Sequence, residues 1–203
     1  MTGQPTLVER WQAVAAQPLN YVQPERLNEC FAHSLNAEQL NALLARSRFR
    51  TRLERLLSDH FKLVPLSQPR VEADIRIMLL AVEQLPRLAL LCGATWHANA
   101  LAREIRGTAV HALKNKLGSD VFEFALAHRN QAGAVGVHFE AEQLLEAIER
   151  DGEACVRAWL CSLPDDLHRW LRLRLDSRWL QFSDFPPEGI TLIREIAAKE
   201  FAG

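Results

Sequence analysis

The amino-acid sequence predicts an all-α fold. Apolar residues recur at the three- and four-residue spacing of helices through most of the chain, whereas the sustained alternation of a half-buried strand is scarce. Prolines and glycines interrupt this pattern at short intervals, so we expect about eight to ten helices of short to medium length. The chain has 203 residues, of which 48% are hydrophobic, and can therefore bury a sizeable core as a single compact domain.

Three short helices are expected in the first part of the chain. Pro5 opens the first, which should end before Pro18, because proline suits a first helical turn and disfavours helix in the residue that precedes it. Pro24 opens the second helix in the same way. Asn36 and Gln39 have the spacing of a capping box, which predicts that a third helix starts directly after Asn36.

The third helix should break or bend near residues 46–48. Leu40 and Leu44 lie on one apolar stripe, whereas Leu53 and Leu57 lie on another. At about 100° per residue, the two stripes are rotated by more than a quarter turn. One straight helix could not turn both stripes toward the same core.

A central buried helix is expected in the middle of the chain. A helix before the central one should start near Pro69, because proline suits a first helical turn. Pro86 should kink or end this earlier helix. Residues 88–96 are apolar nearly all round, which is typical of a helix enclosed by others. Further helices are expected at 98–105, 108–116 and 120–128.

The last part of the chain should begin with a long helix. It starts near Glu140 and keeps one apolar face as far as Leu163. This face runs through Gly152, which costs about 1 kcal/mol of helix propensity but would let another helix approach closely. A short helix that carries Trp170 follows, and a final helix covers 190–201.

Two points of organisation follow from this pattern. Leucines alternate with arginines near Leu171–Leu175, which leaves room for one short extended segment. The simplest organisation is a single helical domain over 1–203, within which the N-terminal helices at 5–64 could form a subdomain against a core made by 69–203.

Composition points to a soluble cytoplasmic protein. The formal net charge is −1 and the isoelectric point is about 6.7, so no overall field attracts nucleic acid or an acidic membrane. The longest uncharged stretch, 88–102, is too short and too polar to span a bilayer, and 1–18 lacks the pattern of a signal peptide. The four cysteines lie in apolar or helical surroundings, which is typical of buried reduced thiols.

The sequence contains no recognisable catalytic or metal motif, so we expect neither an enzyme nor a cofactor. His138, Phe139 and Glu140 match half of a zinc deaminase signature, but the required cysteine pair does not follow. Cys155 and Cys161 would point in different directions from one helix, which prevents them from sharing a metal. His97 is expected to be a hydrogen-bonded interior residue. A catalytic site assembled from distant residues stays open, because sequence does not reveal it.

Two groups of arginines are the candidate partner-binding residues. In the first group the arginines point away from the apolar stripe, which fits a solvated face, a docking surface for an acidic partner, or contact with nucleic acid. The second group combines arginine with tryptophan, which is enriched at protein–protein interfaces but also fits a buried tryptophan with flanking arginines. The first group is Arg48, Arg52 and Arg55, and the second is Trp170, Arg172, Arg174 and Arg178.

Three regions resemble the SctK (YscK, PscK) accessory proteins of bacterial type III secretion systems, in the same order and at similar spacing. The first is Tyr21–Leu27. The second runs from Leu90–Gly93 through His97 to Ala102–Ile105, and the third is Ala158–Leu175, with Ala-Trp-Leu before a proline and then Trp170 and Leu-Arg-Leu. Together these regions span most of the chain, and each is a pattern rather than a chemically specific motif.

The resemblance implies a mostly helical cytoplasmic adaptor of the injectisome, held at the inner membrane through the secretion apparatus. Such a protein joins the cytosolic domain of the inner-membrane ring protein (SctD) to the pod protein (SctQ), and so indirectly to the SctL stalk and the SctN ATPase. It implies no enzymatic activity, no cofactor and no direct insertion into the membrane. The alternative is a helical regulator that binds nucleic acid through the arginine clusters, against which the near-zero net charge argues.

Overall fold

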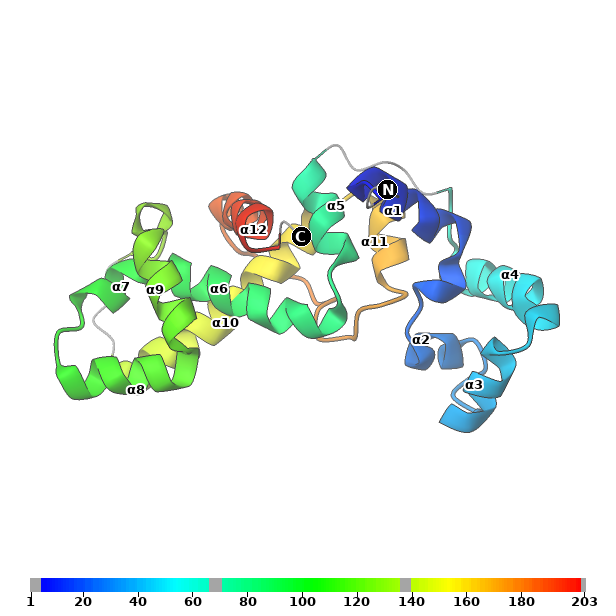
Figure 1. Cartoon of the computed structure of the whole chain (residues 1–203), viewed down its shortest axis with the longest axis horizontal. Coiled ribbons are helices and arrows are strands. Elements are labelled where there is room, and N and C mark those ends of the chain that lie inside the picture. Colours follow the sequence, from blue (N-terminus) through cyan, green and yellow to red (C-terminus); the bar gives the residue numbers. More distant parts are fainter. Residues whose placement is uncertain (1–4, 66–70, 136–139, 202–203) are drawn as a thin grey trace. The chain divides into compact units, whose positions relative to one another are not determined.

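The computed structural model of the chain describes residues 5–65, 71–135 and 140–201, and these residues form an all-α structure (Figure 1). Within the described residues there are twelve α-helices, four short 3₁₀-helices and no strand, which confirms the predicted fold class. The α-helices are more numerous than the eight to ten expected. Pro69, His138 and Phe139, which entered the predictions, lie outside the described residues.

The helices follow one another with short connections. In the first part of the chain they are α1 (Leu7–Ala16), η1 (Pro18–Asn20), α2 (Pro24–Glu29), α3 (Ala37–Leu44), η2 (Ser47–Phe49), α4 (Arg50–Phe61) and α5 (Glu72–Leu79). In the second part they are η3 (Val82–Gln84), α6 (Leu85–Trp96), α7 (Ala98–Arg103), α8 (Gly107–Leu117), α9 (Ser119–Ala127), η4 (Arg129–Gln131), α10 (Ala141–Ser162), α11 (Asp165–Leu171) and α12 (Pro187–Glu200).

Contacts within the chain divide it into two compact units. Unit 1 consists of Met1–Leu79 and Leu163–Leu180, and unit 2 consists of Leu80–Ser162 and Gln181–Gly203. The N-terminal helices therefore share their unit with α11, which the expected subdomain at 5–64 did not include. That the whole chain acts as a single domain stays a prediction.

The start of α3 and the break after it agree with the sequence prediction. The Asn36 side chain accepts a hydrogen bond from the Gln39 amide at 2.9 Å, and the Gln39 side chain accepts one from the Asn36 amide at 2.9 Å. Helix α3 ends at Leu44, and η2 redirects the chain before α4 begins. Leu40 and Leu57 can therefore both enter the core of unit 1, although they lie on different stripes.

A hydrophobic cluster in the core of unit 1 joins the N-terminal helices to α11 and the turn that follows it. Its buried members are Tyr21, Leu27, Leu40, Leu57, Phe61, Trp170 and Leu173. Polar ends of the large side chains are hydrogen-bonded, since the Tyr21 hydroxyl donates to the Met78 carbonyl at 3.0 Å and the Trp170 indole donates to the Val64 carbonyl at 3.0 Å. Burial raises the pKa of Tyr21 to about 12.

The segment near Leu171–Leu175 is not extended, which corrects that part of the prediction. Helix α11 ends at Leu171, and turns follow, in which the Leu173 amide donates to the Trp170 carbonyl and the Arg174 amide donates to the Leu171 carbonyl. The turns bury Leu173 and Leu175 without a strand. Arg174 thereby leaves the apolar face that it would occupy if α11 continued as a helix.

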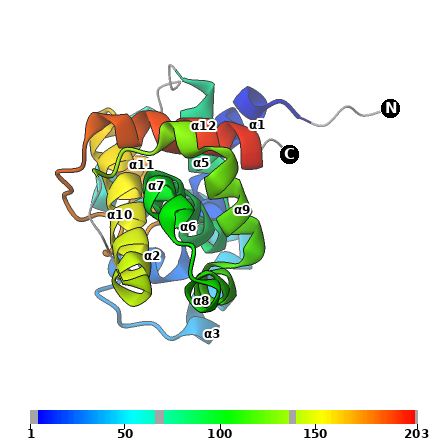
Figure 2. The same cartoon turned by 90° about the vertical axis from the view of Figure 1, so that its left-hand side faces the viewer.

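Helix α6 is the central element of unit 2, with α9, α10 and α12 packed around it (Figure 2). It crosses α10 where Gly93 of one helix faces Gly152 of the other. A Cβ atom added to Gly152 would lie 2.1 Å from the Ala89 carbonyl oxygen, and one added to Gly93 would lie 1.9 Å from the Ile148 carbonyl oxygen. The close helix approach predicted at Gly152 is therefore confirmed.

Pro86 and the cysteines lie partly as the sequence predicted. Pro86 lies in the first turn of α6, so the predicted interruption falls before it and the proline opens the central helix. All four cysteines are free; Cys92 and Cys155 are buried, whereas Cys161 is exposed, contrary to the expectation of four buried thiols. Within the described residues, no single helix has both the length and the apolar character needed to cross a bilayer.

Candidate functional site: an arginine-rimmed groove on unit 1

A groove of about 910 Å³ lies on the surface of unit 1 beside α4. Its apolar lining comes from four successive segments, with Phe31 after α2, Leu43 on α3, Phe49 on η2, and Leu53 and Leu56 on α4. Leu53 is buried and the other four are half-buried, so they present apolar surface to the groove. The break between α3 and α4 allows these side chains to line one common surface.

The first predicted arginine group lines this same groove. Arg48, Arg52 and Arg55 are exposed, and Asp59 is the carboxylate that accompanies them there. Arg52 and Arg55 lie on the side of α4 opposite to the buried Leu57, and Arg48 lies on η2 directly before that helix. The structure thus brings all three predicted residues together, beside an apolar surface that the sequence did not reveal.

Most of this positive charge is available to a ligand. Within the described part of the chain, Arg48 and Arg52 have no carboxylate partner, and the Arg48 guanidinium lies 4.7 Å from the centre of the Phe49 ring. The Nε atom of Arg55 lies 3.9 Å from a carboxylate oxygen of Asp59, with both side chains well exposed, and such a pair contributes little stability. Among the described residues, the groove therefore combines apolar surface with two arginines that have no carboxylate partner.

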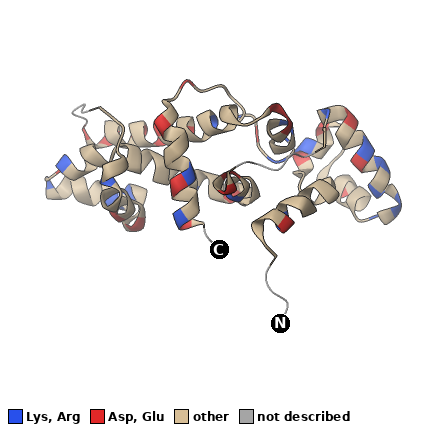
Figure 3. Ribbon diagram, turned by 90° about the horizontal axis from the view of Figure 1, so that it is seen from above, with Lys and Arg blue, Asp and Glu red and all other residues tan. Residues whose placement is uncertain are grey.

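Arg50, which lies among these residues in sequence, faces another direction. Its guanidinium donates to the Asn20 side chain at 2.9 Å and pairs with Glu54 at 3.3 Å, so it ties α4 to η1 within unit 1. Figure 3 shows Lys and Arg gathered along the end of unit 1 that α3 and α4 form. The arginine cluster thus contains both a structural cation and cations directed at the groove.

The second predicted group is not a single surface. Trp170 is buried, with 5% of its surface exposed, and Arg174 stacks on the Tyr21 ring at 4.6 Å while donating to the Met78 carbonyl at 2.9 Å. For these two residues the structure favours the interpretation of a buried tryptophan with flanking arginines. Arg178 packs on the Trp179 ring at 4.8 Å and pairs with Asp176 at 3.3 Å, in an exposed position.

Arg172 lies in a different, smaller pocket of unit 1. This pocket has a volume of about 270 Å³, and its cationic lining also includes Lys62 and Arg169. Arg169 donates to the Lys62 carbonyl at 3.0 Å, which joins α11 to the end of α4. Sequence reasoning missed Lys62 because its position depends on how α4 ends.

Charge is divided unequally between the two units. Unit 1 contains 14 Lys and Arg residues against 11 Asp and Glu residues, a formal net charge of +3. Unit 2 contains 10 against 14, a formal net charge of −4. The near-neutral total of −1 therefore conceals one basic and one acidic unit.

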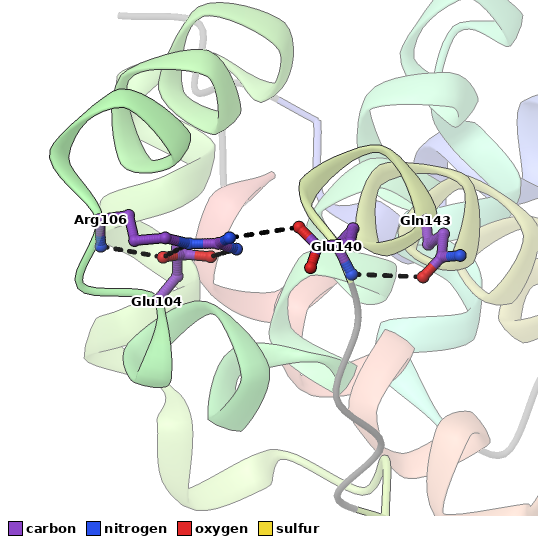
Figure 4. Close-up of polar contacts among 4 residues, drawn as sticks. All are labelled: Glu104, Arg106, Glu140 and Gln143. Carbon is purple, nitrogen blue, oxygen red and sulfur yellow. Dashed lines mark hydrogen bonds and ion pairs between the residues drawn. The ribbon is translucent and has the colours of Figure 1, made fainter.

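A second charged cluster lies on unit 2 and is drawn in Figure 4. The Arg106 guanidinium pairs with Glu104 at 2.7 Å and with Glu140 at 3.2 Å, and the Glu140 amide donates a hydrogen bond to the Gln143 side-chain oxygen at 3.2 Å. Hydrogen bonds from the Arg106 side chain and backbone lower the pKa of Glu104 to about 2. Ile105, between the paired residues, is 89% exposed.

Two further titratable groups, His97 and Cys30, are buried or half-buried. His97 is buried and its Nε2 atom lies 2.8 Å from a carboxylate oxygen of Asp151, which agrees with the expected interior role. In the groove, burial and the nearby Glu29 carboxylate raise the pKa of the Cys30 thiol. In the described ranges, no three His, Cys, Asp or Glu residues are grouped so that they could hold a metal ion.

Comparison with known proteins shows a partial similarity to two nodulation proteins. The chain is 36% identical over 78 residues to the nodulation protein NolU of Rhizobium fredii, and equally to NolU of Sinorhizobium fredii (strain NBRC 101917 / NGR234). The match covers 38% of this chain and 37% of the length of each relative. No model of a protein family matches the chain, and no solved structure matches it.

Proposed function

We propose that this protein is a non-enzymatic adaptor of a bacterial type III secretion injectisome. It would work in the cytoplasm and link the cytosolic domain of the inner-membrane ring protein (SctD-type) to the pod protein (SctQ-type), and so to the SctL stalk and SctN ATPase. The proposal draws on the resemblance of Tyr21–Leu27, Leu90–Ile105 and Ala158–Leu175 to the SctK accessory proteins. The similarity to NolU adds a bacterial relative whose name places it in nodulation.

The groove on unit 1 is the observation that best supports an adaptor role. Arg48 and Arg52 stand beside half-buried apolar side chains and lack carboxylate partners in the part of the chain that the structure describes. A surface of this kind suits a protein partner, because apolar contacts supply affinity and unpaired cations supply orientation and faster association. The opposite charges of the two units suit an adaptor that holds two different partners.

Charge reversal in the groove tests the proposed function. We expect the triple variant Arg48→Glu, Arg52→Glu, Arg55→Glu to lose binding to one of the two partners by at least about tenfold, because three exposed attractive charges become repulsive. Binding would be measured by isothermal titration with the purified ring-protein domain and pod protein. Circular dichroism of the variant would verify its helical content, and unchanged binding by a folded variant would remove the groove from the adaptor account.

The same variant addresses the alternative of a nucleic-acid-binding regulator. If the arginines contact phosphates, the wild-type chain should bind duplex DNA of any sequence with a steep dependence on salt, and the triple variant should not. Binding to duplex in place of either protein partner would replace the adaptor proposal.

A further inference from the structure

The apolar lining of the groove has the character of a docking surface. Phe31, Leu43, Phe49 and Leu56 come from four different segments and are each half-buried, so their uncovered parts form one shared apolar surface. Apolar surface gathered in this way, with a polar edge, is typical of sites that bind other proteins. Isolated exposed apolar residues would carry no such meaning.

The polar groups of the groove select for negative charge. Arg48 and Arg52 are without carboxylate partners among the described residues, and Asp59 sits at the long distance of 3.9 Å from Arg55. A ligand carboxylate can therefore reach two guanidinium groups without displacing an internal ion pair. Guanidinium and carboxylate form charge-assisted, often bidentate hydrogen bonds, which add direction to the attraction.

The remaining lining offers little to a small polar ligand. Besides the charged residues, its side-chain polar groups are the Thr51 hydroxyl and the Cys30 thiol. Burial raises the pKa of that thiol. Small-molecule sites usually place several convergent polar groups within an enclosed cavity, whereas this groove has an apolar base with cations along it.

We propose that the groove on unit 1 binds an amphipathic helix of a partner protein, with the apolar face of that helix on Phe31, Leu43 and Leu56 and its Asp or Glu side chains at Arg48 and Arg52. A helix presents apolar anchors at i, i+3, i+4 and i+7 along one face, which is the recognition mode of helices that lie in apolar grooves. Charge complementarity identifies the occupant as acidic. The inference rests on the proposed function only for the identity of the partner that carries the helix.

The first test uses a designed peptide, so that it does not depend on a partner. Its probe is a fluorescein-labelled amphipathic peptide of about 18 residues, roughly 27 Å of helix, with leucines on one face and glutamates beside them. A second peptide replaces each glutamate by glutamine. In fluorescence anisotropy with the full chain, the acidic peptide should bind at least about tenfold more tightly than its neutral counterpart. Equal binding of the two peptides would overturn the inference.

Matched variants locate the charge effect in the groove. The double variant Arg48→Glu, Arg52→Glu should abolish the preference for the acidic peptide. Arg46→Glu provides the control, because Arg46 is exposed and close in sequence but does not line the groove. If a single reversal at Arg46 reduced binding as much as reversal at Arg48 alone, a general positive field rather than the groove would explain the preference.

A second pair of variants tests the apolar surface. Leu56→Gln should weaken binding of the acidic peptide about tenfold or more, because Leu56 would contact the apolar face of the helix. Leu44→Gln is the control, since Leu44 is 36% exposed on the neighbouring helix and lies outside the groove. Circular dichroism would verify that both variants fold. If both folded variants lost the same amount of peptide binding, Leu56 would not be a contact of the bound helix.

The last test identifies the helix in a partner and separates this inference from the proposed function. A photo-crosslinking amino acid replaces Thr51, which is exposed in the groove, and the chain is mixed with the ring-protein domain and the pod protein. Cross-linking to an acidic amphipathic helix supports the inference. A complex that forms without such a cross-link overturns it and leaves the adaptor role intact. If the peptide binds but no complex with either partner forms, the adaptor role alone is overturned. If duplex DNA displaces the peptide, the groove binds nucleic acid instead of a protein helix.

Discussion

At the scale of single residues, the same side-chain types serve opposite purposes in this protein. Arg174 donates to a backbone carbonyl and stacks on Tyr21, so its charge helps to hold unit 1 together. Arg52 lies in the groove without a carboxylate partner in the described residues. Both arginines occur in similar runs of arginine and leucine. Only their contacts in the fold distinguish the arginine that stabilises unit 1 from the arginine that is available to a partner.

Trp170 provides a first prediction at this scale. The substitution Trp170→Phe removes the indole donor to the Val64 carbonyl and some apolar contact, and we expect it to lower the free energy of unfolding by about 1–3 kcal/mol. Urea denaturation followed by circular dichroism would measure the loss. Because Trp170 is buried, partner binding by the folded variant should be unchanged. A loss of binding at unchanged stability would instead make Trp170 an interface anchor.

Glu104 provides a prediction about pH. Its pKa in the folded protein, about 2, lies below the ordinary value of 4.5, so its pairing with Arg106 stabilises the fold above pH 4.5 and is lost as the pH falls toward 2. The variant Glu104→Gln should therefore melt below the wild type at pH 6, and this difference should shrink as the pH falls from about 5 to 3.

Differential scanning calorimetry at a series of pH values would measure the two melting temperatures. Glu83, which is exposed on the same unit, supplies the control variant Glu83→Gln. A melting difference for Glu104→Gln that stays constant over this pH range would contradict the assigned role of the Arg106 pairing.

At the scale of elements, the crossing of α6 and α10 depends on two glycines. The variant Gly152→Ala would place a Cβ atom 2.1 Å from the Ala89 carbonyl oxygen, which is impossible without moving one helix. The steric cost of about 1–3 kcal/mol, at times more, should outweigh the roughly 1 kcal/mol that alanine gains in helix propensity. We therefore expect a net loss of up to about 2 kcal/mol in the free energy of unfolding.

A control for Gly152 exists within the same unit. Gly107 begins α8, and a Cβ atom added there would meet nothing within 4 Å. The variant Gly107→Ala should be neutral or slightly stabilising, by up to about 1 kcal/mol. Chemical denaturation of both variants would compare them directly. Equal effects at the two glycines would show that propensity, rather than the helix crossing, determines their stability.

The sequence predicted these elements well where the signal is local, and poorly where it depends on distant parts of the chain. The capping box at Asn36 and the continuous apolar face through Gly152 are local patterns, and both predictions are confirmed. The alternation of leucine and arginine near Leu171–Leu175 left room for an extended segment, but consecutive turns bury alternate leucines there instead. An alternating sequence fits both a short strand and a series of turns, so the sequence alone does not distinguish them.

The candidate site was predictable in part for the same reason. The pairing of Arg52 and Arg55 follows from helical spacing, and Arg48 joins them on one surface from η2. The apolar lining at Phe31 and Leu43 could not be predicted, because these residues reach the groove only through the turns between α2, α3 and α4. The role of Trp170 stayed open in the sequence, because tryptophan with flanking arginines occurs both in protein interfaces and in buried cores.

At the scale of the whole molecule, the two units differ in charge. Unit 1 carries +3 and holds the groove, whereas unit 2 carries −4. An acidic partner of unit 1 should associate faster at low ionic strength and more slowly as salt shortens the Debye length, which is about 8 Å at physiological salt. This dependence should be weaker for a partner of unit 2 that binds through apolar contacts.

The most direct test of the adaptor role is co-purification of the full chain with the ring-protein cytosolic domain and the pod protein across a salt series. We predict a stable complex with each partner at low salt, and a ternary complex when all three are present. The complex made through the groove should weaken as salt rises and should be lost in the triple variant at Arg48, Arg52 and Arg55. Failure of the folded wild-type chain to form a complex with either partner, at any salt concentration, would contradict the account.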